Sequence, residues 1–169
     1  LVHELQKERG ASAAYVGSGG KKMNDVLEDN KRNTNRALTS FQQYLASFDA
    51  KRYGAEFSEK ISSTLTQLKD LTAKRTAVVG LSRTKEEAVR YYTNIIADFI
   101  KSFEYVALQA NHAQISGPAY ACVNFISAKE LAGIERATLS SIVAASKAVE
   151  TQNLANWLSA WKGQERLMN

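Results

Sequence analysis

Two arginines lie on helix faces that are otherwise apolar or built from small residues. Arg9 follows Leu5 by four residues and precedes Val16 by seven, so helical spacing places all three on one face. Arg136 follows Ala132 by four residues in the same way. No acidic residue stands three or four positions from either arginine, so neither has an ion-pair partner within its own helix. Burying an unpartnered guanidinium costs several kcal/mol, so a group outside the helix must offset each charge.

Two kinds of group could supply that negative charge. One is an acidic side chain from another helix, which would make a structural ion pair. The other is a small anion held between the two arginines, because a planar guanidinium presents a fork of donors that matches a planar oxyanion. Arg75 also lies on the apolar face of its helix without any special motif, so position alone does not separate the two interpretations. Small residues leave space beside both arginines: Gly10, Ala11, Ser12 and Ala13 around the first, and Ala132, Gly133, Ala137 and Ser140 around the second.

The elements that carry these arginines are predicted to be long helices. Nine glycines and one proline in 169 residues are few breakers, and apolar residues recur at steps near 3.5. Gly80 ends one helix, the run from Ser82 to Glu87 begins the next with hydroxyl caps and acids, and Pro118 lies near the start of another. We therefore predict an all-α, up-and-down bundle, forming one domain over 1–169. It has about six helices, at about 1–16, 24–49, 55–80, 84–112, 118–148 and 151–169.

Composition argues against several other functions. One cysteine and two histidines, none in zinc-binding spacing, predict neither a metal site nor a cofactor. No nucleophile–base pair or carboxylate pair is recognisable, so we predict no enzyme activity. The net charge is +5, but the basic residues alternate with acids, so no nucleic-acid partner is predicted. Cys122 lies in an apolar stretch and is expected to be buried. The chain starts at Leu1 without a signal peptide or an 18-residue apolar run, so we expect it to be part of a longer protein.

Two strings of the sequence resemble a known family. The opening LVHELQKERGAS, residues 1–12, followed by Gly17-Ser18-Gly19, resembles the start of the nitrate- and nitrite-sensing (NIT) domain family. The string FISAKELAGIERA, residues 125–137, resembles the second signature of that family. The resemblance covers the whole chain. The family module is longer, and we expect its C-terminal helices to lie beyond Asn169.

The resemblance implies where the ligand binds. In this family an all-helical module senses nitrate or nitrite, and one arginine from each signature is implicated in holding the anion. These two arginines correspond to Arg9 and Arg136. We expect Ser12 or Ser140 to donate a further hydrogen bond and Lys129 to add positive charge. One departure from the pattern is Ala137, which stands where the first signature has Gly10 and adds a methyl group near the site.

The resemblance also implies a biological setting. Members of the family occur on chemoreceptors, histidine kinases, nucleotide cyclases and a transcription antiterminator, and the opening string is most like the chemoreceptor branch. We therefore predict a periplasmic homodimer that meets the membrane only through segments outside this chain, or a cytoplasmic module if it belongs to an antiterminator-type regulator. Two alternatives stay open. One is a sensor of a carboxylate or amino acid, with a subsite near Tyr91-Tyr92 or Phe125, and the other is a purely structural dimerisation bundle.

Overall fold

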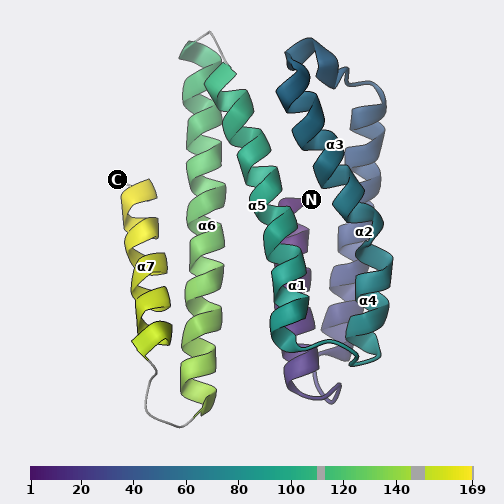
Figure 1. The fold of residues 1–169 in the computed structure, drawn as a ribbon, viewed down its shortest axis with the longest axis vertical. Helices are drawn as coiled ribbons and strands as arrows, with labels where there is room; N and C mark the ends of the chain where they lie inside the picture. Colours follow the sequence, from purple (N-terminus) through teal and green to yellow (C-terminus); the bar gives the residue numbers. More distant parts are fainter. Residues whose placement is uncertain (110–112, 146–150, 169) are drawn as a thin grey trace. The chain divides into compact units, whose positions relative to one another are not determined.

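All regular structure in the described part of the chain is helical (Figure 1). A computed structural model describes residues 1–109, 113–145 and 151–168. The predicted all-α class is confirmed, with seven α-helices and one short 3₁₀ helix over those residues. The α-helices are α1 (Val2–Gly17), α2 (Asn24–Ala46), α3 (Ala55–Lys69), α4 (Leu71–Val79), α5 (Lys85–Gln109), α6 (Ala113–Ala145) and α7 (Thr151–Met168), and the 3₁₀ helix is η1 (Ala50–Tyr53).

The chain forms two compact units, Leu1–Ser102 and Phe103–Asn169. In the first unit α1 packs along α2 and touches α4, and hydrogen bonds join α1 to α5. Its core is apolar, and the fully buried side chains include Leu5, Leu27, Ile95, Ile96 and Phe99. In the second unit α6 and α7 pack against each other. The organisation of 1–169 as one sensor domain stays a prediction.

The start of α5 follows the sequence prediction closely. The backbone N–H of Glu87 donates to Thr84 Oγ1 at 3.1 Å, and the backbone N–H of Thr84 donates to Glu87 Oε2 at 3.0 Å. This reciprocal pair is a capping box, which satisfies two backbone donors at the helix start. The bond from Thr84 holds the pKa of Glu87 below its usual value. Glu87 therefore has a local structural role.

Two predicted helices differ most from those observed, while the helix expected over 24–49 ends three residues early at Ala46. The helix expected over 55–80 is two helices, α3 and α4, separated at Asp70. There the backbone N–H of Asp70 donates to Gln67 O, three residues back, and not to the carbonyl four residues back as in an α-helix. Short polar side chains such as aspartate favour these local breaks. The helix expected at 118 begins at Ala113, so Pro118 lies inside α6. Only one intrahelical bond is lost there, the bond that Pro118 would otherwise donate to Gln114 O.

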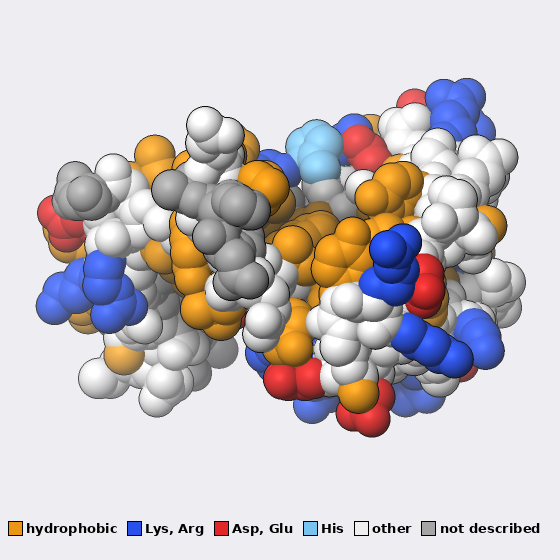
Figure 2. Space-filling model, turned by 90° about the horizontal axis from the view of Figure 1, so that it is seen from above, with side chains coloured by type: hydrophobic (Ala, Val, Ile, Leu, Met, Phe, Trp, Pro, Cys, Tyr) orange, Lys and Arg blue, Asp and Glu red, His pale blue; other side chains and the backbone are white. Residues whose placement is uncertain are grey.

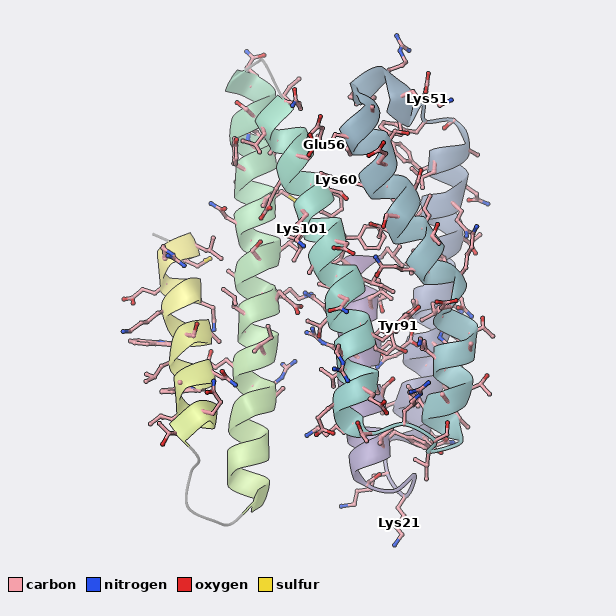
Figure 3. All side chains as sticks on the ribbon, viewed as in Figure 1. Lys21, Lys51, Glu56, Lys60, Tyr91 and Lys101 are labelled. Atoms are coloured by element: carbon pink, nitrogen blue, oxygen red, sulfur yellow. The ribbon has the colours of Figure 1, made fainter. Side chains whose placement is uncertain are left out.

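The distribution of charge on the surface agrees with the mixed pattern of the sequence. On the face seen in Figure 2, Asp and Glu side chains lie beside Lys and Arg side chains. Glu56 and Lys60, labelled in Figure 3, form one such pair on α3 at 3.3 Å. Cys122 was expected to be buried but is exposed in its unit, because it lies on the side of α6 away from the buried Val123 and Ala128. None of the described helices has the length and apolar character needed to cross a membrane.

The second unit is a close-packed helix pair. A Cβ atom placed on Gly163 of α7 would lie 2.7 Å from Leu131 Cδ1 of α6, so the missing side chain allows the two helices to approach. Next to this contact, Gln164 Nε2 donates to Glu135 Oε2 at 2.6 Å. Trp157 is partly buried, whereas Trp161 is 47% exposed in its unit. Glu135 is thus bound to the neighbouring helix, and Arg136 follows it directly.

Candidate functional site

A buried ion pair holds the middle of α1 in the first unit. Glu8 has no exposed surface, and its carboxylate accepts two hydrogen bonds from Arg75 of α4, from Nε at 2.7 Å and from Nη2 at 2.8 Å. The hydroxyl of Tyr92 on α5 donates to Glu8 Oε1 at 2.7 Å. Arg75 Nη1 also donates to Asn35 Oδ1 of α2 at 2.7 Å. One carboxylate thereby links α1 to α4 and α5, and Arg75 extends the network to α2.

The pKa shifts in this network have clear causes. Burial raises the pKa of the Glu8 carboxyl, but the hydrogen bonds to the carboxylate, led by those of Arg75, and the charge of Arg75 together outweigh burial, so the pKa lies below its usual value. Burial and the neighbouring Glu8 charge raise the pKa of Tyr92 well above its ordinary range. Glu8 is therefore a carboxylate and Tyr92 a neutral donor at neutral pH.

Arg9 lies beside this network and is held by a different residue of α5. Its side chain is only 7% exposed, as the apolar stripe of α1 predicts. Arg9 Nη1 donates to Thr93 Oγ1 at 2.9 Å, and the Thr93 hydroxyl in turn donates to the carbonyl of Val89 at 2.9 Å. Two neighbouring residues of α1, Glu8 and Arg9, therefore bind two neighbouring residues of α5. The guanidinium that the sequence singled out is buried and tied to α5.

Ser12 lies one turn after Arg9 and is fully buried. Its hydroxyl is near Tyr92, yet Ser12 Oγ makes no hydrogen bond of normal geometry within the described part of the chain. A buried hydroxyl without a partner is uncommon, since it carries the cost of leaving water without replacement. Arg9 and Ser12 thus place a cation and an unsatisfied hydroxyl on one buried stretch of α1.

The other predicted site residues belong to the second unit. Arg136 is exposed within its unit, and no ion pair of its side chain is found in the described residues. Lys129 is partly buried. The side chain of Ser140 lies outside those that the structure describes. The structure therefore brings together Arg9 and Ser12, and the approach of Arg136, Lys129 and Ser140 to them stays a prediction.

Sequence reasoning missed two residues of the first unit. Glu8 was not among the predicted site residues, although Leu5, Glu8, Ser12 and Tyr15 follow helical steps of three and four and are all buried. That alternative stripe was the available signal. Thr93 carried no signal, because a threonine on a helix is common and its partner Arg9 is 84 residues away. From the sequence, an acid from another helix was considered as a partner for Arg9 and Arg136; the buried ion pair that the described residues show here joins Arg75 to Glu8.

The proposed carboxylate or amino-acid subsite near Tyr91-Tyr92 has little support in the structure. Tyr91, labelled in Figure 3, donates its hydroxyl to the carbonyl of Gln67 at 3.0 Å. Tyr92 donates to Glu8. Both phenol donors are thus used within the first unit, and each pKa is raised chiefly by burial. Phe125, the other suggested location, is 63% exposed in the second unit.

Comparison with known proteins finds a matching family and related proteins. A family described as nitrate and nitrite sensing matches residues 1–169. The chain is 31% identical over 139 residues to the nitrate regulatory protein of Klebsiella oxytoca, covering 81% of this chain and 34% of that protein. It is also similar to the solved structure of the NasR transcription antiterminator, with a TM-score of 0.89 and 26% identity over 99% of this chain and 45% of that one. The chain thus spans less than half of each relative.

Proposed function

The chain belongs to the nitrate- and nitrite-sensing domain family, and on that premise we propose that it binds one nitrate or nitrite ion between Arg9 and Arg136. The observation that carries the proposal is the buried guanidinium of Arg9, with the unsatisfied hydroxyl of Ser12 one turn away. The family is a sensing family and not an enzyme family, so the expected activity is ligand binding and signalling. Binding needs no metal or cofactor, because two guanidinium groups can offset the charge of the anion directly.

Corresponding contacts in the two units support this pairing. In each signature a glutamate comes directly before the arginine, and in each unit that glutamate accepts hydrogen bonds from a neighbouring helix. Glu8 accepts from Arg75 and Tyr92, and Glu135 accepts from Gln164. Adjacent residues lie about 100° apart around a helix, so an arginine next to an anchored glutamate faces a different direction. Each glutamate would thus fix its helix within its own unit while the arginine serves the ligand.

The remaining predicted residues have supporting roles in the proposal. Ser12 or Ser140 would donate to an oxygen of the anion that the guanidinium groups do not reach. Lys129 would add positive charge one heptad before Arg136. Without a ligand the two arginines would repel each other, and with a ligand α1 and α6 would be drawn together. This displacement would be the signal passed to the output part of the protein.

Two settings for this module follow from different observations. The opening string of residues 1–12 resembles the chemoreceptor branch, which favours a periplasmic sensor in a homodimeric receptor. The two relatives are a nitrate regulatory protein and a transcription antiterminator, which favour the cytoplasmic alternative and do not support the chemoreceptor branch. Fractionation of cells that produce the full-length protein separates these settings, since only a receptor would sediment with the membrane. The absence of a nucleic-acid contact by this module stays a prediction in both.

We expect nitrate to bind the module with a dissociation constant of roughly tens of micromolar or weaker. The ceiling for very small ligands is about −1.5 kcal/mol per heavy atom, which gives about −6 kcal/mol for four atoms. Nitrite keeps one two-oxygen edge and should bind more weakly. Acetate adds a methyl group that the small residues around Gly10 and Gly133 leave little room for, and spherical chloride cannot accept two parallel N–H bonds on separate atoms.

Isothermal titration calorimetry with nitrate, nitrite, acetate and chloride measures this order. The predicted result is nitrate tightest, then nitrite, then acetate and chloride. Displacement of nitrate by chloride at equal concentration would contradict binding by planar forks and leave a generic positive pocket. Tight binding of acetate or an amino acid in place of nitrate would favour the alternative sensor.

A further inference from the structure

We infer that Gln164 of α7 is a positioning residue for the anion site, because it holds the carboxylate of Glu135 away from Arg136. The inference rests on the proposed function and adds to it a residue from α7. It starts from the hydrogen bond of 2.6 Å that Gln164 Nε2 donates to Glu135 Oε2. All three residues belong to the second unit, in which α6 and α7 lie side by side (Figure 1).

The packing of α6 against α7 fixes the position of the Gln164 amide. The close approach at Gly163, one residue before Gln164, is to Leu131, which precedes Glu135 by four residues. Leu131 and Glu135 therefore share the face of α6 that packs against α7. Gln164 Nε2 also donates a longer bond, of 3.4 Å, to the carbonyl of Ala160, a buried residue one turn back on α7. The amide is thus held between the two helices, and its shorter bond goes to Glu135.

Arg136 lies off the face of α6 that meets α7. Adjacent residues are about 100° apart around a helix, and Arg136 is exposed in its unit whereas Glu135 is partly buried. No acid stands three or four positions from Arg136, so Glu135 is the acid nearest to it in the sequence. The position of the Glu135 carboxylate therefore decides how much negative charge of α6 lies beside Arg136.

A carboxylate released from Gln164 would compete with an anion for Arg136. Glutamate and arginine have long, flexible side chains, so a free Glu135 can bend towards the exposed guanidinium and form an ion pair with it. A nitrate ion would then have to displace this carboxylate or bind beside a second negative charge. The bond from Gln164 to the carboxylate is charge-assisted, and it holds Glu135 on the side of α7. Glutamine suits this role because its amide donates to a carboxylate and has no negative charge of its own.

The test measures the nitrate affinity of the full-length protein by isothermal titration calorimetry. Gln164→Met keeps the length of the side chain and removes the donor. We expect it to weaken nitrate binding about fivefold, which corresponds to about 1 kcal/mol and to a partly exposed ion pair between Glu135 and Arg136. Adding Glu135→Gln to Gln164→Met removes the competing charge and should restore affinity to within about twofold of the wild type. A role of Gln164 in stability alone would not give this rescue.

Gln152→Met on the same helix is the matched control. Gln152 Nε2 also donates to a side-chain oxygen, Asn156 Oδ1 at 3.0 Å, but this pair is exposed. The control should bind nitrate as the wild type does, and circular dichroism measures the helical content of every variant. If Gln164→Met does not fold, Gln164→Asn takes its place, because it withdraws the amide by one methylene group, and the same loss and rescue are expected.

The outcomes separate the inference from the proposed function. Wild-type affinity in a folded Gln164→Met variant would overturn the inference and leave the anion site intact. Equally weak binding by Gln164→Met with and without Glu135→Gln would also overturn it, because the charge of Glu135 would then not be the competing group. Failure of the wild type to bind nitrate at all would overturn both the proposed function and the role of Gln164.

Discussion

Replacing Arg9 or Arg136 with alanine should abolish measurable nitrate binding while the helical fold remains. Each guanidinium is expected to supply two charge-assisted hydrogen bonds, each with a net contribution of about 1.5–3 kcal/mol, so losing one arginine should weaken binding about a hundredfold or more. Arg9→Lys should fail as well, since a point charge cannot reproduce the two-pronged donor. Isothermal titration calorimetry measures the loss of affinity, and circular dichroism measures the helical content of each variant.

A matched control comes from an exposed arginine of the same chain. Arg83 forms a surface ion pair with Glu87 at 3.2 Å, and its side chain is 51% exposed. Arg83→Ala should leave nitrate affinity unchanged. If Arg9 and Arg136 support the fold and not a ligand, their alanine variants should lose helical structure. If both alanine variants unfold and the wild type binds no anion, the arginines serve the bundle and not a ligand.

Arg75→Met should cause the largest loss of stability of any single substitution proposed for this protein. The change leaves the fully buried carboxylate of Glu8 without its main partner. Removing one member of a buried ion pair costs about 3–5 kcal/mol in the free energy of unfolding. Urea denaturation followed by circular dichroism at neutral pH measures this loss. The contrast with Arg9→Ala is the essential point, because Arg75 should affect stability and Arg9 should affect ligand binding.

The loss of unfolding free energy in Arg75→Met should become smaller as the pH falls. In the wild type the pKa of Glu8 is below its usual value, so its stabilising contribution is present above the unfolded-state pKa and is lost as the pH falls through the folded-state pKa. In Arg75→Met the hydrogen bond from Tyr92 remains, but the hydrogen bonds and charge of Arg75 are gone, so burial raises the pKa of Glu8 above its wild-type value and the variant regains stability as Glu8 takes up a proton. Exposed Arg83→Met is the control, and it should change the free energy of unfolding by less than about 1 kcal/mol. A constant difference between wild type and Arg75→Met at every pH would argue against a charged Glu8.

Local features of the fold could be predicted from the sequence because their causes lie within a few residues. The capping box at Thr84, the helix end at Gly80 and the apolar face that buries Arg9 are all of this kind. The break at Asp70 was missed, because a helix that loses its regular hydrogen bonding at one residue keeps the same spacing of apolar residues on either side. Pro118 was placed at a helix start because proline favours that position, although α6 tolerates it five residues further in.

The candidate site shows the same difference between features with local causes and features that depend on distant residues. Arg9 and Ser12 were found because they share a helix face, and their burial is confirmed. The contacts of Glu8 and Thr93 were missed because their partners lie 67 and 84 residues away, and no local spacing encodes a contact of that range, although helical spacing could have indicated that Glu8 is buried. The pairing of Arg9 with Arg136 came from the resemblance to the family and not from geometry. The relation between the two units decides whether the two arginines meet.

The most direct measurement is a crystal structure of the module grown with nitrate. We predict a planar anion in contact with both arginines, with the guanidinium groups of Arg9 and Arg136 about 4–8 Å apart, the span set by two N–H···O bonds that meet on one ion. The Glu8–Arg75 ion pair should be present in the same crystal. An anion bound elsewhere, or Arg9 and Arg136 at opposite ends of the molecule with nitrate present, would contradict the account.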